Sequence, residues 1–311
     1  MPTTTPPLDF GPRFEVAWRS LVSPQGNVGR ENQDNYLVVD GHGRAESLKG
    51  QLPHRFDIPN WPAGHIRLAL LDGMGGHQYG REVTERIVEG LADLPACSEQ
   101  GELDEALDAL HHQVREAFAS ATKAPGSTLT LLEISPGRDA LLYHVGDSRM
   151  YAVTAEEAQC LTVDHAPPTR YFMQGLIDAT EWHRQTHEED RSALSQAFGM
   201  GSALNSLTLL EPNLVALGAE NLPPELASLA DRRALALAPD RLYLLASDGL
   251  WAYPEPHSFI RRWPEILCGR DHARLDYLLD DLFEAHILGS TDLADIDNST
   301  AIFFRLSSKT A

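Results

Sequence analysis

Four aspartates stand at the ends of apolar, strand-like runs. Asp34 precedes NYLVVD, Asp72 ends HIRLALLD, Asp248 ends DRLYLLASD, and Asp297 lies just before TAIFFRL. If these runs pack into one core, their ends can converge. Converging carboxylates repel one another and cannot all stay ionised without a cation between them. For any single aspartate a helix cap or a turn is an equally good explanation, but this explanation is poor for all four together.

Oxygen-only clusters suit the hard cations Mg²⁺ and Mn²⁺ rather than zinc. The glycines that follow Asp72 fit the same chemistry, because Gly73, Gly75 and Gly76 let the backbone approach closely and a carbonyl there can act as a further ligand. Several carboxylates around a water-filled rim indicate a site for two metal ions. Two such ions can activate a hydroxide for attack on phosphorus.

The elements that must position these residues can be read from the apolar pattern. Helices are expected at 81–95, 103–122 and 271–288, where apolar residues recur at three- and four-residue steps. Strands and helices cluster rather than alternate strictly, which favours an α+β layered fold over a doubly wound parallel sheet. The expected strands are 35–40, 65–72, 127–134, 140–147, 149–153, 240–248 and 300–306.

The remaining segments are predicted to be irregular or peripheral. Residues 41–64 and 211–238 read as loops or insertions whose roles are open, and 164–203 reads as a polar, partly helical surface subdomain with too few apolar positions for a core. Residues 1–15, rich in Pro and Thr, are predicted to form a flexible tail before a single domain at 16–311.

Composition excludes several classes of protein. The 311 residues carry a net charge of −20, which argues against nucleic acid and anionic membrane surfaces as partners. No apolar run is long enough to span a bilayer, and the N-terminal residues do not form a secretory signal. Three widely spaced cysteines (97, 160 and 268) argue against structural disulfides, so a cytoplasmic location is expected.

The motifs RENQD, DGMGGH, GST, HVGDSRMY, SDGLW and DNST occur in that order between about residues 20 and 306. In this combination the sequence strongly resembles the metal-dependent protein phosphatases of the 2C type, also called PPM, in their bacterial form. The resemblance implies a four-layer α-β-β-α sandwich of two mainly antiparallel sheets flanked by helices. It also implies a flap subdomain at 164–203 that helps to select the substrate.

The same resemblance implies which residues form the active site and what each of them does. Asp72 would bridge two Mn²⁺ or Mg²⁺ ions, and the Gly73 carbonyl would bind one of them. Asp34, Asp248 and Asp297 would supply the remaining ligands or hold metal waters. A bridging hydroxide would hydrolyse phosphoserine or phosphothreonine in one step. In HVGDSR, Asp147 and Arg149 would be structural and would fix the edge of the sheet.

Three departures from the family pattern matter. The phosphate-binding arginine is usually five residues before the aspartate, where this chain has Gly29; Arg30 takes that role only if a local bulge restores its direction. Ala124 stands where bacterial relatives have a third-metal aspartate, so a third site is expected to be weak or absent. His77 is a candidate acid for the leaving group, or it anchors the glycine turn by hydrogen bonds.

The sequence therefore predicts a cytoplasmic protein-serine/threonine phosphatase in signal transduction, with substrates phosphorylated by a serine/threonine kinase. One alternative is a catalytically weak or inactive signalling or binding module with the same fold, and another is a phosphatase of small esters. A zinc site at His183 and His187 lacks a third ligand at a recognised spacing. The glycines match no nucleotide-binding loop, no GxSxG occurs, and the oligomeric state is not predicted.

Overall fold

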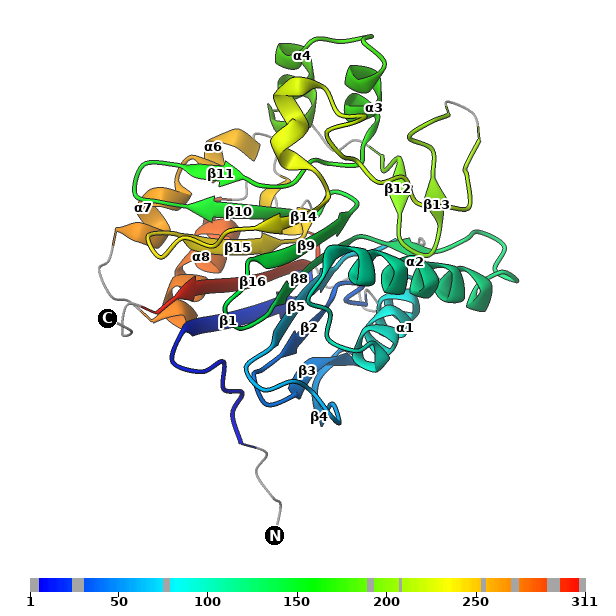
Figure 1. Cartoon of the computed structure of the whole chain (residues 1–311). Coiled ribbons are helices and arrows are strands. Elements are labelled where there is room, and N and C mark those ends of the chain that lie inside the picture. The colour runs from blue at the N-terminus through cyan, green and yellow to red at the C-terminus, as the bar shows by residue number, and fades with distance from the viewer. Residues whose placement is uncertain are drawn as a thin grey trace.

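The computed structural model describes residues 6–23, 31–74, 79–188, 193–206, 209–252, 256–269, 274–289 and 297–307. Two β-sheets pack face to face, and helices cover the outer face of each sheet (Figure 1). The pairings within the two large sheets are antiparallel. The predicted α+β class and the four-layer α-β-β-α sandwich are confirmed.

The larger sheet has the strand order β14-β9-β8-β5-β2-β3-β4. Its central strand β5 is buried along its whole length because alternate side chains face different layers. Leu68 and Leu70 lie in the core between the sheets, whereas Ala69 and Leu71 face the helices. The strands are β2 (Asn35–Val39), β3 (Arg44–Lys49), β4 (Leu52–Asp57), β5 (Ile66–Leu71), β8 (Leu129–Ile134), β9 (Ala140–Val145) and β14 (Arg232–Leu235).

The smaller sheet has the order β1-β16-β15-β10-β11, so its first and last strands in the sequence are paired with each other. Tyr243, Ile302 and Phe304 point from this sheet into the shared core and meet Leu68 and Leu70 there. Burial of such apolar residues is the main favourable contribution to folding. The strands are β1 (Phe14–Leu21), β10 (Arg149–Val153), β11 (Ala158–Cys160), β15 (Leu242–Ala246) and β16 (Ser299–Leu306).

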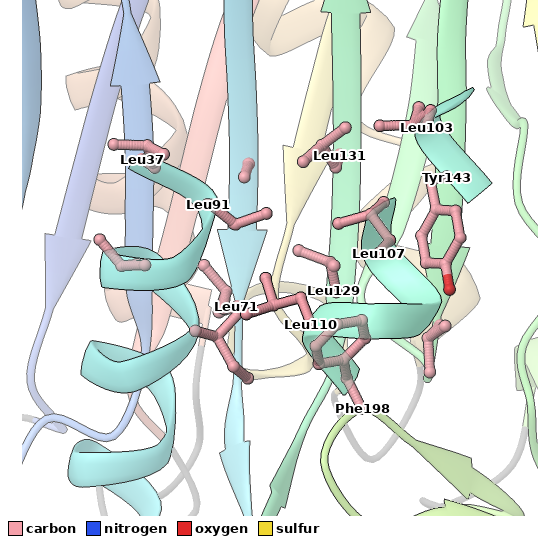
Figure 2. Packing of buried hydrophobic residues seen from close by; sticks show 14 of the residues in the cluster. Leu37, Leu71, Leu91, Leu103, Leu107, Leu110, Leu129, Leu131, Tyr143 and Phe198 are labelled. Carbon is pink, nitrogen blue, oxygen red and sulfur yellow. The ribbon is translucent and has the colours of Figure 1, made fainter. Parts of the chain in front are cut away.

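Two long helices, α1 (Gly80–Asp93) and α2 (Gln100–Ala117), cover the larger sheet. Figure 2 shows Leu91 of α1 and Leu107 of α2 packed against sheet residues such as Leu129. The smaller sheet is covered by α7 (Trp263–Cys268) and α8 (Leu275–Gly289), while α5 (Asp248–Trp251) and α6 (Pro256–Ile260) follow β15. Within the described ranges, no helix combines the length and apolar character that crossing a bilayer requires.

The prediction of a loop at 41–64 was wrong, because this segment contains the β3–β4 hairpin. Ala45 and Leu48 of β3 are buried, and the polar residues between them hid the strand pattern. The hairpin turns at Gly50 and Gln51, which both have positive φ angles of 56° and 67°. Two such residues form the tight turn that suits the twist of a hairpin, and Gly-Gln is not one of the usual sequences for it.

The segment 211–238 was also not simply a loop. It contains the 3₁₀ helix η3 (Pro224–Leu229) and strand β14. Its residues Leu217, Leu222 and Leu226 pack with Phe172 and Trp182 into a small separate hydrophobic cluster. The predicted surface subdomain at 164–203 therefore does have a core, because half of that core comes from a later part of the chain.

This subdomain, hereafter the flap, contains α3 (Pro167–Met173), α4 (Ala179–His183) and the π-helical turn η2 (Arg184–Glu188). Its helices lie at one end of the sandwich, at the top of Figure 1. Two short pairs of strands lie outside the two large sheets: β12 (Gln196–Ala197) with β13 (Gly201–Ser202), and β6 (Gly73–Met74) with β7 (Gly126–Ser127). A bridge between Ser127 and Phe198 joins the two regions.

The predicted flexible tail of residues 1–15 was too long. Strand β1 already begins at Phe14, and Leu8 and Phe10 pack against the core between the sheets. The amide of Asp9 also donates a hydrogen bond of 2.7 Å to the buried carboxylate of Asp40. Apolar residues among the prolines thus hold the described part of this segment against the domain.

Because its cluster is separate from the main cores, we predict that the flap can be loosened alone. Trp182→Ala removes a side chain that is 6% exposed and whose indole donates to Thr169, which should cost the flap about 3–5 kcal/mol. Hydrogen exchange should accelerate in residues 163–188, while the sheets stay protected. The matched control is Trp263→Ala, in the core of the smaller sheet, which should lower the melting temperature of the whole domain. Equal loss of protection in sheets and flap from Trp182→Ala would contradict the prediction.

Candidate functional site

The site begins with the pairing of β2 and β5. These strands are antiparallel and Asn35 lies opposite Leu71, so the register continued by one place sets Asp34 opposite Asp72. The start of one strand and the end of the other therefore meet at one edge of the sheet. Two aspartates that are 38 positions apart in the sequence become neighbours in this way.

The smaller sheet brings the other two aspartates to the same place. β15 and β16 are antiparallel, and the amide of Ser247 donates to the Thr300 carbonyl just beyond their paired residues. Asp248 begins α5 at this point. The Ser247 hydroxyl then donates a hydrogen bond of 2.8 Å to Asp34 Oδ2. The rims of the two sheets are thus joined by a direct contact between a hydroxyl and a carboxylate.

Asn298, the residue after Asp297, forms a second set of hydrogen bonds between segments of the site. Its side-chain amide donates to the Glu31 carbonyl at 3.2 Å, and its side-chain oxygen accepts from the Ser23 amide at 3.1 Å. Its own amide donates to Asp297 Oδ1 at 2.8 Å. The motif DNST therefore fixes the segment that leads to Asp34 as well as the orientation of Asp297.

The four carboxylates interact electrostatically. Burial raises the pKa of Asp34 to about 7, opposed by hydrogen bonds from Ser247 and Thr300, while Asp248 and Asp297 push it further up. Desolvation raises the pKa of Asp72 well above its ordinary value, and the negative charges of Asp248, Asp34 and Asp147 add to this. The carboxyl groups of Asp72 and Asp248 lie within hydrogen-bonding reach of each other. Asp34, Asp72, Asp248 and Asp297 therefore lie close enough to interact, and their role as metal ligands stays a prediction.

Two glycines explain how these segments come so close. A Cβ atom at Gly73 would overlap with the Gly80 carbonyl oxygen and lie 2.6 Å from that of Gln33, next to Asp34. A Cβ atom at Gly249 would overlap with the carbonyl oxygen of Asn298. The glycine directly after each of Asp72 and Asp248 thus allows backbone to pass where no side chain fits.

The motif GST holds the main chain of Asp72. The amide of Asp72 donates to Thr128 Oγ1 at 2.9 Å, and its carbonyl accepts from the Thr128 amide and from the Ser127 hydroxyl. Thr128 Oγ1 also lies 2.6 Å from the hydroxyl of Ser148. These contacts connect β5, β7 and the turn before β10, so they restrict where the Asp72 carboxylate can point.

Sequence reasoning missed part of the site. Asp147 was predicted to be structural, yet it is close enough to Asp72 to raise its pKa. Ser247 and Thr300 were not singled out, although both bond to Asp34. The sequence did contain a signal for them: Ser247 directly precedes Asp248 and Thr300 follows Asp297 by three residues, both at the rim of an apolar strand, where a buried polar side chain needs a partner.

Arg149 is structural, as predicted, but it does not fix a sheet edge. β10 lies between β15 and β11, and the Arg149 side chain is fully buried and paired with Asp164. The two histidines of the zinc alternative do lie together, with the ring centres of His183 and His187 4.9 Å apart and His257 6.2 Å from His183.

The donor chemistry of the site fits hard divalent cations. Among the residues described, no group of three or more His, Cys, Asp or Glu side chains is arranged to enclose one ion, and this includes the histidines of the flap. Mg²⁺, however, keeps several waters and takes one or two carboxylates from a protein. Paired carboxylates with raised pKa values are therefore sufficient for such an ion, and a cation would relieve the repulsion between them.

Two of the predicted catalytic residues, Arg30 and His77, lie outside the described residues, as do Gly75 and Gly76. Ala124 lies within them, in an exposed position where it lines a surface pocket together with Arg115 and Gly199, and its methyl group offers no ligand. The expectation of a weak or absent third metal site remains a prediction.

A sandwich of two antiparallel sheets with carboxylates clustered at one end is the arrangement that the resemblance to 2C-type phosphatases implied. No family model matches the chain. The chain is 31% identical over 209 residues to the mouse "Probable protein phosphatase 1N", covering 63% of this chain and 48% of that protein. It is 32% identical over 197 residues to the serine/threonine protein phosphatase PstP of Mycobacterium tuberculosis, covering 60% of this chain and 32% of that protein. The chain thus spans about a third to a half of these relatives.

Solved structures of bacterial phosphatases can be superposed on almost the whole chain. The crystal structure of the M. tuberculosis serine/threonine phosphatase PstP/Ppp matches with a TM-score of 0.59 and 24% identity, covering 95% of this chain and 99% of that one. The catalytic domain of PstP in complex with two manganese ions matches with a TM-score of 0.57 and 22% identity, over 95% and 99% of the two chains. The chain has the fold of these bacterial serine/threonine phosphatases, and the predicted resemblance is confirmed.

The raised pKa of Asp34 predicts a pH dependence of stability in EDTA. Between pH 3.8 and about 7 the unfolded chain has lost this proton while the folded chain keeps it, so the contribution of Asp34 to stability falls as the pH rises. Asn cannot ionise, so Asp34→Asn should gain stability relative to the unmodified protein between pH 4 and pH 8, by up to about 4 kcal/mol.

Chemical denaturation of both proteins at each pH measures this difference. The comparison with the variant cancels the contributions of buried histidines such as His286, whose lowered pKa of about 4 acts in the opposite direction. Asp139→Asn, at an exposed loop position, is the control and should show no such trend. A difference between Asp34→Asn and the unmodified protein that stays constant from pH 4 to pH 8 would contradict the prediction.

Proposed function

We propose that this protein is a Mn²⁺- or Mg²⁺-dependent protein-serine/threonine phosphatase. The observation that carries the proposal is the meeting of Asp34, Asp72, Asp248 and Asp297 at one end of the sandwich, with the pKa of Asp34 and Asp72 raised. Such a cluster is costly unless divalent cations occupy it. Serine/threonine phosphatases among its relatives, one of them solved with two manganese ions, support the same chemistry.

In this proposal Asp72 and the Gly73 carbonyl would hold two divalent cations, and Asp34, Asp248 and Asp297 would complete the protein ligands. The cations, when bound, supply a hydroxide nucleophile at neutral pH and stabilise charge on the phosphoryl group. The protein contributes the placement of the ligands: Ser247 orients Asp34, Thr128 fixes the main chain of Asp72, and Asn298 orients Asp297.

Arg30 and His77 are proposed to act on the substrate. The guanidinium of Arg30 would bind two phosphate oxygens and hold the phosphoryl group for attack opposite the leaving oxygen. The serine or threonine oxygen needs a proton when its bond to phosphorus breaks, and His77 would donate it.

The substrates in this proposal are phosphorylated proteins, the products of a serine/threonine kinase, and the role is in signal transduction. The three cysteines at 97, 160 and 268 are free thiols, which supports a reducing, cytoplasmic location. The net charge of −20 supports neither nucleic acid nor an anionic membrane surface as a partner.

We predict that the purified protein hydrolyses a phosphothreonine peptide in the presence of Mn²⁺ and stops when EDTA is added. Asp72→Asn should lower kcat/KM by more than about a hundredfold, because changes outside the ligand shell already cost 10–100-fold at metal sites. Asp139→Asn is the matched control and should retain full activity.

Three other outcomes of these measurements would favour a different function or a different mechanism. No Mn²⁺ binding by calorimetry and no turnover would favour a binding module with this fold. Faster hydrolysis of small phosphate esters than of the phosphopeptide would favour the small-ester alternative. Full activity in EDTA would overturn metal dependence altogether.

We predict that Arg30→Ala raises KM for the phosphopeptide by roughly 10–100-fold and changes kcat less, because charge-assisted hydrogen bonds to phosphate contribute about 1.5–3 kcal/mol to binding. Arg138→Ala, which removes an exposed arginine beside Glu99, serves as the control and should leave KM unchanged. If KM and kcat of Arg30→Ala both equal those of the unmodified protein, the assignment of Arg30 to phosphate binding is wrong.

A further inference from the structure

One guanidinium group lies where three parts of the molecule meet. Arg149 stands at the start of β10, and its side chain is fully buried. Its Nε and Nη2 donate to Asp164 at 2.9 and 2.7 Å, which forms a bidentate ion pair with the residue that begins the flap. The buried pair fixes the position of the flap relative to the sheet.

The same group also holds the η2 turn of the flap. Nη2 of Arg149 also donates a hydrogen bond of 2.6 Å to the main-chain carbonyl of Thr186, in η2. The entry and the last described helical turn of the flap are therefore attached to a single side chain. Nη1 donates to the Tyr151 hydroxyl at 3.1 Å, which keeps the guanidinium aligned with the sheet.

The third part is the helix that carries Asp248. The Arg149 guanidinium carbon lies 3.5 Å from the ring centre of Trp251, a cation–π contact with a residue that is 5% exposed. Trp251 ends the single turn of α5 that Asp248 begins, so the Trp251 ring and the Asp248 carboxylate belong to the same helical turn. The guanidinium is therefore in direct contact with the turn that carries Asp248.

We propose that Arg149 is a positioning residue that couples the flap to the Asp248 end of the metal site. Displacement of the flap would change the affinity of the site for divalent cations, and cation binding would in turn order the flap, because coupling between two sites is reciprocal. The proposal rests on the proposed function, in which Asp248 is a metal ligand. In this proposal the flap influences the metal affinity of the site as well as the selection of the substrate.

Lysine cannot replace Arg149 in this role. It keeps the charge opposite Asp164, but it lacks the planar fork that reaches Asp164, Thr186 and Tyr151 together while stacking on an indole. Arg149→Lys should therefore weaken Mn²⁺ binding about tenfold, as is typical for residues that orient metal ligands. It should also accelerate hydrogen exchange in residues 163–188 and 248–252 together, in metal-free protein.

The chain provides a matched control at Arg67. This arginine is also buried, pairs with the buried Glu133 at 2.7 Å, donates to the carbonyls of Leu91 and Pro95, and lies 4.9 Å from the ring centre of Trp61. It connects β5 to the end of α1, and the hydrogen bonds and ion pair that it makes within the described ranges involve neither the flap nor α5. Arg67→Lys should lower the melting temperature as Arg149→Lys does, but leave Mn²⁺ affinity and flap exchange unchanged.

A double-mutant cycle tests the coupling if Arg149→Lys does not fold. Trp182→Ala loosens the flap, and Trp251→Leu removes the stacking contact but leaves the ion pair with Asp164 in place. We expect Trp182→Ala to weaken Mn²⁺ binding severalfold by calorimetry in the unmodified background and to have no further effect in Trp251→Leu.

The outcomes are distinguishable. If the unmodified protein binds no Mn²⁺, the proposed function fails, whereas the hydrogen-exchange comparison in metal-free protein still tests whether Arg149 joins the flap to α5. If Mn²⁺ binds and Arg149→Lys behaves as Arg67→Lys in both measurements, the coupling is wrong. Additive effects of Trp182→Ala and Trp251→Leu would overturn it as well.

Discussion

The crowding of negative charge at one end of the sandwich is the constraint on which the rest of the site depends. Four aspartates lie where the two sheets meet, and the pKa of Asp34 and Asp72 is raised by burial and by the neighbouring carboxylates. Water alone stabilises this arrangement poorly, since each ionised group is partly removed from solvent. The surrounding hydrogen bonds and close backbone contacts keep the carboxylates together despite their repulsion.

These supports come from positions with small or hydroxyl-bearing side chains. Ser247 and Thr300 bond to Asp34 across the gap between the sheets, and Thr128 binds the main chain at Asp72. Gly73 and Gly249 leave room for neighbouring backbone. The glycine that follows an aspartate in each motif is thus required by packing, whether or not its carbonyl also binds a cation.

Much of this could be predicted from the sequence because the strands are buried on both faces. Continuous apolar runs such as those of β5 and β15 marked the strands, and an aspartate at the end of each run is conspicuous. The β3–β4 hairpin could not be found in this way, because β4 is an exposed edge strand and its turn uses Gly50 and Gln51.

The core of the flap was hidden for a different reason: Leu217, Leu222 and Leu226 reach Trp182 from a segment more than thirty residues further along the chain. The proximity of Asp147 to Asp72 was not predicted, because the motif HVGDSR gives no sign of which distant carboxylate it will face. Local patterns indicate which residues form elements, but they do not show which distant segments will share a cluster.

The place of β16 in the smaller sheet has a consequence for synthesis of the protein. This strand, Ser299–Leu306, lies between β1 and β15, so the first strand of the chain has no neighbour in its sheet until one of the last is made. A ribosome that adds about 5–20 residues per second would leave β1 waiting for some 15–60 seconds. Neither the sheet nor the cluster of aspartates beside it can form during that time, so the proposed metal site stays incomplete until Asp297 and β16 have been made.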